Sequence, residues 1–257
     1  MPDLTLWNGD CLEIMKQIPD KSIDLIICDL PYGCLSTPKI GGGQNIRLPE
    51  DRCSWDIKIN LEEFWKQIKR IRKSDHSPTI HFCTTKFGFE LHASNPDEFR
   101  YDLVWDKHRG VSFLHANKMP MRSHEMIYVF SKARAFYERK DITGDFQSWK
   151  VKREGQTALH YAGAKRTNTE GGDGKRCVLS VVQHPTSSRK DGHPTEKPES
   201  LYRFLIERYC PVDGTVLDPT FGSGNSVFTA FSMGRSAIGI EKDDTFFKKA
   251  EERLNKL

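Results

Sequence analysis

The sequence lacks long apolar runs and paired cysteine motifs. No stretch of about 18 consecutive apolar residues occurs, so we expect no membrane-spanning helix. The first residues, MPDLTLWNGDCLEIM, lack the basic-then-apolar layout of a secretory signal, and we therefore expect a cytoplasmic protein. The seven cysteines include no Cys-x-x-Cys pair. Their spacing disfavours a disulfide framework or a zinc site, and we expect reduced thiols and no metal.

The composition is that of a folded protein with one substantial core. The chain has 257 residues, of which 37% are hydrophobic and 11% aromatic, and its length predicts one or two domains. The net charge of +4 is too small to indicate a nucleic-acid-binding protein by itself. The charge is unevenly distributed, however: residues 132–190 hold 13 basic and 6 acidic side chains, so that this segment carries +7 and the remainder −3. A locally basic segment is typical of a surface that faces a polyanion, although a solvated loop region would look similar.

Apolar patterning predicts strands that alternate with helices. Strands are expected at 4–7, 23–28, 79–83, 101–105, 126–130, 215–217 and 237–240, and helices at 11–17, 61–71, 86–94, 198–209, 226–233 and 246–254. The alternation predicts an α/β fold, a mainly parallel, doubly wound sheet of the Rossmann-like type. The segments 101–105 and 126–130 are expected to form a late, antiparallel hairpin. Periodicity fails between 131 and 192, which predicts an inserted subdomain.

Two of the expected strands end in unusual sequences. The run IDLIIC continues into Asp29-Leu30-Pro31-Tyr32-Gly33, and the strand at 215–217 continues into Asp218-Pro-Thr-Phe-Gly-Ser-Gly-Asn. Ligands of open α/β sheets bind beyond the carboxyl ends of strands. The glycines would let a ligand approach the backbone, and the following helix start offers free N–H groups. Glu241, after the next strand, is placed to bind ribose hydroxyls. Val227 stands where a dinucleotide fingerprint has its third glycine, so a nicotinamide site is disfavoured.

Together these two motifs resemble those of the amino-group DNA methyltransferases. The DLPY segment precedes the Phe-x-Gly-x-Gly segment, with the predicted insertion between them, and this order is similar to the β subgroup of that family. Further similar elements are Gly9-Asp10-Cys11, Asp106-Lys107, His124-Glu125 and the segment 193–198, HPTEKP. The family pattern has Pro where this chain has Leu30; the chemistry needs only a backbone carbonyl there, and Leu loses some stiffness of the turn.

The resemblance implies three parts: a catalytic half at 1–131, a target-recognition insertion at 132–192 and a cofactor-binding half at 193–257. It implies S-adenosylmethionine as the methyl donor, with Asp10 and Cys11 at its adenine, Glu241 at its ribose and Lys197 at its carboxylate. The full implied cofactor set is Asp10, Cys11, Asp29, Lys197, Asp218, Phe221, Gly222, Ser223, Gly224, Asn225 and Glu241. For His124 and Glu125 we expect a structural hydrogen-bonding role.

The implied catalytic residues are Asp29, Leu30, Pro31 and Tyr32. An exocyclic amino nitrogen is a poor nucleophile because its lone pair is delocalised into the ring. If Asp29 and a neighbouring carbonyl such as that of Leu30 accept its two hydrogens, the lone pair turns toward the methyl group. Tyr32 would stack on the target base.

A base inside a duplex cannot enter such a pocket, so base flipping is implied and double-stranded DNA is the expected partner. Phosphate contacts are expected from basic residues of the loop at 34–56 and of the insertion. The candidates are Lys39, Arg47, Arg52, Arg139, Lys140, Lys152, Arg153, Lys165 and Arg166.

Several alternatives stay open at this point. Asp at the head of the motif favours adenine over cytosine as the target. Methylation of cytosine carbon five is disfavoured, because that chemistry needs a Cys nucleophile and no Pro-Cys dipeptide occurs. RNA or protein methylation is disfavoured by the basic insertion. A catalytically silent DNA-binding module is a further alternative. A cognate restriction enzyme and a homodimer would be in keeping with the resemblance.

Overall fold

The structure is a computed structural model that describes residues 2–33, 57–111, 113, 116–143, 175–186 and 196–256. The chain divides into two compact units. The larger unit comprises Met1–Glu138 and Ser180–Leu257, and the smaller comprises Arg139–Leu179. In the described part of the smaller unit, two short strands pair antiparallel, β6 (Ile142–Thr143) and β7 (Lys175–Arg176).

An eight-stranded sheet forms the centre of the larger unit, in the order β1-β10-β9-β2-β3-β5-β4-β8. Its strands are β1 (Leu4–Asn8), β2 (Leu25–Cys28), β3 (Thr79–Cys83), β4 (Phe99–Val111), β5 (Arg122–Phe130), β8 (Val181–Gln183), β9 (Thr215–Asp218) and β10 (Ser236–Glu241). The five strands from β1 to β3 in this order are parallel. Strand β5 is antiparallel to β3 and β4. The predicted α/β fold with a mainly parallel sheet and a late antiparallel hairpin is confirmed.

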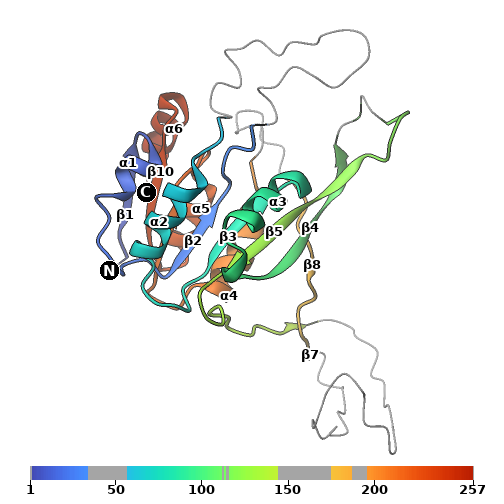
Figure 1. Ribbon diagram of the computed structural model, residues 1–257, viewed down its shortest axis with the longest axis horizontal. Helices are drawn as coiled ribbons and strands as arrows, with labels where there is room; N and C mark the ends of the chain where they lie inside the picture. The colour runs from blue at the N-terminus through green and yellow to red at the C-terminus, as the bar shows by residue number, and fades with distance from the viewer. Residues whose placement is uncertain are drawn as a thin grey trace, which may run out of the picture. The chain divides into compact units, whose positions relative to one another are not determined.

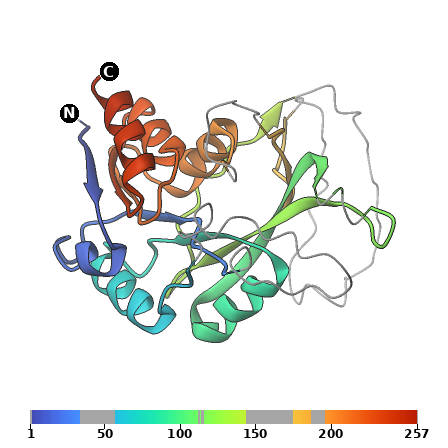
Figure 2. The same cartoon turned by 90° about the horizontal axis from the view of Figure 1, so that it is seen from above.

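Helices cover both faces of this sheet. They are α1 (Cys11–Met15), α2 (Leu61–Ile71), α3 (Thr85–Ser94), α4 (Glu199–Tyr209), α5 (Asn225–Ser232) and α6 (Asp244–Leu254). Figures 1 and 2 show α1, α2 and α3 on one face and α4, α5 and α6 on the other. A short 3₁₀ helix, Pro96–Glu98, precedes β4. No helix in the described ranges is long and apolar enough to span a membrane.

The central strands form because their sequences suit burial on both faces. Every residue of β2, LIIC, and of β3, TIHFC, is buried, as expected for parallel strands between two helical layers. Helix α2 has its apolar residues on one face and begins where the Asn60 side chain accepts a hydrogen bond from the Glu63 amide at 3.2 Å. Phe64, Trp65 and Ile68 of this helix join the core.

The chain reverses its winding between β2 and β9. These neighbours are parallel, with Leu25 opposite Val216. After β2 the chain continues to β3 on one side, and after β9 it continues to β10 on the other. Loops that leave adjacent parallel strands in opposite directions open a crevice beyond their carboxyl ends. Both of the motifs that follow these strands therefore border one crevice.

The sequence did not predict strand β8. It lies within the segment 132–192 that we expected as an insertion, yet it pairs parallel with β4 at the edge of the main sheet, Val104 opposite Val181. Its three residues, VVQ, are too few to show an alternating pattern. The domain boundaries inferred from the resemblance stay a prediction.

Candidate active site

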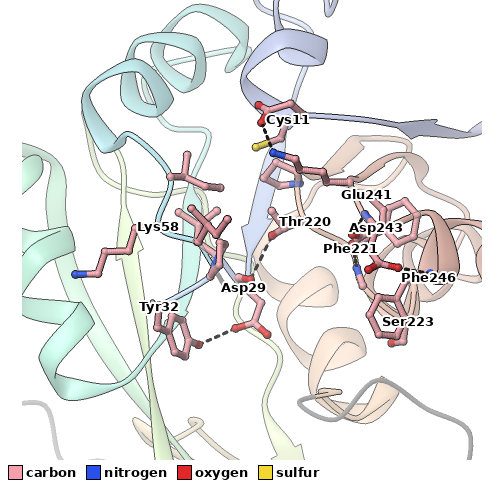
Figure 3. Close-up of a pocket in the computed structure, with 18 of the residues that line it drawn as sticks. Cys11, Asp29, Tyr32, Lys58, Thr220, Phe221, Ser223, Glu241, Asp243 and Phe246 are labelled. Carbon is pink, nitrogen blue, oxygen red and sulfur yellow. Dashed lines mark hydrogen bonds and ion pairs between the residues drawn. The ribbon is translucent and has the colours of Figure 1, made fainter. Parts of the chain in front are cut away.

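A pocket of about 560 Å³ lies at this crevice, and both motifs line it. Tyr32, from the loop after β2, and Gly222, from the turn after β9, are both lining residues. Figure 3 shows the pocket in close-up: Asp29 and Tyr32 lie toward one side, and Phe221, Ser223 and Phe246 toward the other. Two stretches nearly two hundred positions apart therefore contribute to one cavity.

The glycine-rich turn is fixed by Glu241 at the end of β10. The Gly222 amide donates to Glu241 Oε2 at 2.8 Å, and the Asp243 amide donates to Oε1 at 2.7 Å. Burial raises the pKa of Glu241, and these backbone N–H groups offset part of that rise. Gly224 has a φ of +80°, and a Cβ there would lie 2.7 Å from the Phe228 ring. Glycine is thus required at this position both by conformation and by space.

Asp10 and Cys11 lie at the start of α1, on the same edge of the sheet. The Asp10 carboxylate accepts from the Leu12 amide at 3.0 Å and pairs with Lys242 at 3.1 Å. Partial burial tends to raise the pKa of Asp10, but the hydrogen bonds from Lys242 and Leu12 outweigh it and leave the pKa lowered. Burial raises the pKa of Cys11 to about 12, with the Asp10 charge adding to the effect. The Cys11 side chain is therefore a neutral thiol that lines the pocket.

Asp29 connects the two motifs. The Tyr32 hydroxyl donates to Asp29 Oδ1 at 2.7 Å, and the Thr220 hydroxyl donates to the Asp29 carbonyl at 3.3 Å; Figure 3 shows both bonds. The Tyr32 ring also packs on Phe87, with ring centroids 5.1 Å apart. Burial and the neighbouring Asp29 charge raise the pKa of Tyr32 well above its ordinary value, so this residue keeps its proton and remains a donor.

Lys197 lines the same pocket, with only 2% of its side chain exposed. Its ammonium group binds Asp29 Oδ2 and lies 3.5 Å from Glu125 Oε2. Lys107 in turn binds Glu125 Oε1. Burial tends to lower the pKa of Lys197, but the charges of Asp29 and Glu125 outweigh it and raise the pKa, so Lys197 is charged. Asp29, Lys197, Glu125 and Lys107 therefore form a row of four alternating charges that begins at the DLPY segment.

Three residues of the implied cofactor set, Asp218, Gly224 and Asn225, do not line the pocket. Asp218 is buried, accepts from Ser226 at 2.5 Å, and has its pKa raised by burial to about 7. Asn225 donates to Glu196 at 2.6 Å and to the Lys197 carbonyl at 3.1 Å. Gly224 precedes helix α5. The other predicted cofactor and catalytic residues all line the pocket; they are Asp10, Cys11, Asp29, Leu30, Pro31, Tyr32, Lys197, Phe221, Gly222, Ser223 and Glu241.

Most of the predicted DNA contacts lie outside the described residues. These are Lys39, Arg47, Arg52, Lys152, Arg153, Lys165 and Arg166. Arg139 and Lys140 belong to the smaller unit, where Arg139 forms an ion pair with Asp141 at 2.6 Å. The role of all nine residues in DNA binding stays a prediction.

The pocket also holds residues that the motifs did not single out as site residues. Glu125, expected to be structural, lines it together with Tyr202, Lys58, Asn60 and Phe246. Six carboxylates and three lysines line the pocket, a net charge of −3 that suits a cationic ligand. Of these five residues, only Glu125 was noted in the sequence, as part of the His124-Glu125 element that resembles the family. Among the described residues no group of three or more acidic, His or Cys side chains is arranged to hold a metal ion.

Comparison with known proteins shows the family of the chain. The N6/N4 family model described as DNA methylase matches residues 23–252. The type II methyltransferase M.HinfI of Haemophilus influenzae is 29% identical over 269 residues, covering 98% of this chain and 68% of the relative.

Two solved structures share the fold. PvuII DNA methyltransferase, named as cytosine-N4-specific, superimposes with a TM-score of 0.67 at 16% identity, over 98% of this chain and 86% of that one. The M1.HpyAVI complex with S-adenosylmethionine gives a TM-score of 0.59 at 18% identity, over 98% and 100% of the two chains. The family match covers most of the sequence, and the chain therefore belongs to the N6/N4 DNA methylase family.

Proposed function

We propose that the protein transfers a methyl group from S-adenosylmethionine to the exocyclic amino group of adenine at a specific site in double-stranded DNA. The observation that carries this proposal is the pocket lined both by Asp29 to Tyr32 and by the glycine-rich turn at 221–223. Membership of the family supports an amino nitrogen as the acceptor. The finer choice of adenine rests on Asp29 at the head of the motif.

The residues of the pocket fit the cofactor. S-adenosylmethionine supplies a methyl group on a positively charged sulfur, which leaves as a neutral thioether. Glu241 is held by two backbone amides at the pocket wall and would accept hydrogen bonds from the ribose hydroxyls. Phe221 and Ser223 would surround the methionine part, and Asp10 would lie at the adenine end. The net negative lining of the pocket favours the sulfonium over a neutral sulfur.

Asp29 is placed to make the amino nitrogen nucleophilic. Tyr32 donates to its Oδ1 and Lys197 to its Oδ2, but each carboxylate oxygen accepts more than one hydrogen bond. An amino hydrogen of the base can therefore bind Asp29 while both partners remain. A second hydrogen would bind the Leu30 carbonyl, and the lone pair would then point at the methyl group, which is stabilisation specific to the transition state. The Tyr32 ring would stack on the base.

Substitution of Asp29 tests this mechanism. Asp29→Ala should lower the rate of methyl transfer at least about 100-fold, because it removes an acceptor used in the transition state. The Kd of S-adenosylmethionine should change much less, since Asp29 is one of several lining residues. Labelled methyl transfer and equilibrium cofactor binding measure the two effects. Undiminished transfer in this variant would rule out the mechanism.

The target base is decided by the product. Mass spectrometry of nucleosides from DNA methylated by the wild-type enzyme should show N6-methyladenine. N4-methylcytosine is the second candidate product, and the observation in its favour is the fold shared with a methyltransferase named as cytosine-N4-specific. A cognate restriction enzyme and a homodimer stay predictions from the resemblance.

A further inference from the structure

Glu125 is not explained by the proposed chemistry, although it lines the pocket. It lies on β5, which is antiparallel to β3, so the N-terminal part of β5 lies at the edge where β2 and β3 end. Only 15% of its side chain is exposed. Its Oε2 is buried and makes no hydrogen bond within the described ranges, and its charge is met by Lys197 3.5 Å away. A buried carboxylate oxygen that is only partly satisfied is costly for folding and calls for a functional explanation.

The contacts of Glu125 lead directly to the catalytic motif. Lys197 contacts both Glu125 and Asp29, and Lys107 contacts Glu125 on its far side. The buried Lys197 ammonium is therefore shared between two carboxylates, those of Asp29 and Glu125. If Glu125 lost its charge, Lys197 would pair with Asp29 alone, and the cluster of Asp29, Lys197, Glu125 and Lys107 would change from neutral to a net charge of +1. This change would lie beside the expected position of a sulfonium. The tighter pairing with Lys197 would weaken Asp29 as a hydrogen-bond acceptor. The added positive charge would disfavour binding of a positively charged methyl donor.

We propose that Glu125 is a positioning residue: it holds the Lys197 ammonium in place against Asp29 and, opposed by Lys107, tunes the charge of the pocket to a sulfonium donor. This role rests on the proposed function, in which Asp29 accepts a hydrogen bond from the amino group of the target base. Glu125 would thus affect methyl transfer although it lies on β5, outside the DLPY and glycine-rich motifs.

The first test compares two ligands that differ in the charge on sulfur. S-adenosylmethionine carries the sulfonium and S-adenosylhomocysteine does not. Glu125→Gln should weaken the first relative to the second by about 3- to 10-fold, and Lys107→Met should shift the same ratio in the opposite direction. Isothermal titration calorimetry of both ligands, without DNA, gives the ratio. A general loss of structure would weaken both ligands alike.

Glu98→Gln is the matched control. Glu98 is also a buried carboxylate in an ion pair, with two contacts of 2.8 Å to Arg72, but it does not line the pocket. This variant should lose stability and leave the ratio of the two affinities unchanged. An unchanged ratio in Glu125→Gln, or shifts of the same sign in Glu125→Gln and Lys107→Met, would overturn the charge-tuning role.

The second test asks whether Glu125 acts through Lys197. At saturating cofactor and DNA, Glu125→Gln should lower kcat about 10- to 100-fold, as expected when a reacting group is misplaced slightly. In a Lys197→Met background, Glu125→Gln should lower kcat no further, because the contact between Glu125 and Asp29 through Lys197 is already lost. Additive losses, or a wild-type kcat in Glu125→Gln, would overturn the positioning role. Absence of methyl transfer by the wild-type protein would instead refute the proposed function, and the binding ratio remains measurable in that case.

Discussion

His81 on β3 is a buried ionisable residue whose protonation opposes folding in acid. Its ring is fully buried among Phe64, Trp65 and Phe130, with centroids 5.2 to 5.7 Å away. Neither ring nitrogen has a hydrogen-bond partner in the described part of the chain. Burial lowers the pKa of His81 from 6.5 to about 3. The folded protein therefore holds this ring neutral, whereas the unfolded chain takes up a proton near pH 6.5.

The contribution of His81 to the free energy of unfolding should consequently fall as the pH drops below 6.5. At His81 the unfolded state binds more protons than the folded state between pH 6.5 and about 3, so this residue favours unfolding in acid, by about 2 kcal/mol between pH 7 and pH 5. Asp218, whose pKa burial raises to about 7, acts in the opposite direction in the same range. His81→Leu should remove the His81 contribution, so that on going from pH 7 to pH 5 the stability of the variant rises by about 2 kcal/mol relative to that of the wild type, which urea denaturation at the two pH values measures. The same change in stability between the two pH values in His81→Leu and in the wild type would contradict the prediction.

At the scale of elements, the wall of the pocket depends on how β10 packs beneath the glycine-rich turn. Gly239 lies in β10, and a Cβ there would be 2.6 Å from Phe221 Cδ1 and 3.1 Å from Leu6. Phe221 is buried and lines the pocket. Strand and turn are thus in contact because Gly239 has no side chain.

Gly239→Ala should therefore displace Phe221 and weaken cofactor binding by about 10-fold, with an overpacking cost of about 1 to 3 kcal/mol in stability. Calorimetric titration with S-adenosylmethionine and thermal unfolding test the two parts. Gly234→Ala serves for comparison: Gly234 has a φ of +77°, but a Cβ at this position would meet no described atom within 4 Å. It should cost about 1 kcal/mol through backbone strain alone and leave cofactor affinity unchanged. Equal affinity in Gly239→Ala and wild type would show that the turn accommodates a methyl group.

At the scale of the whole molecule, charge is unevenly distributed along the chain and around the pocket. The segment 132–190 carries +7, whereas the lining of the pocket carries −3. The first suits a polyanion and the second a cationic methyl donor. The small total charge of +4 is therefore the sum of regions whose local charges have opposite signs.

DNA binding should in consequence depend steeply on salt, while cofactor binding should not. With about six phosphate contacts, DNA affinity is expected to fall about 1,000-fold between 50 and 200 mM salt, through release of counterions. Cofactor affinity should change only a few-fold, because charges around a pocket are screened less than exposed ones. Fluorescence anisotropy with labelled duplex DNA and calorimetry with the cofactor provide the two series. A DNA affinity that is insensitive to salt would argue against the basic segment as the DNA-binding surface.

Local sequence was sufficient to predict most of the elements of the sheet. Buried strands such as IDLIIC and amphipathic helices such as 61–71 carry their pattern within a few residues, and helix α2 and strand β3 begin and end where the pattern predicts. Strand β8 was missed, because three residues cannot display a period and its pairing with β4 is formed only in the folded chain.

For the site, the sequence by itself determined the two motifs, because the chemistry of each resides in adjacent residues: a carboxylate, a carbonyl and an aromatic ring in one, and a glycine-rich turn in the other. Only the tertiary structure decided that Glu125 and Lys107 belong with them. Lys107 on β4 contacts Glu125 on β5, and Glu125 contacts Lys197 more than seventy positions away. Ion pairs of this kind leave no periodic trace in a sequence, since they depend on the register of an antiparallel pair and on burial that exists only after folding.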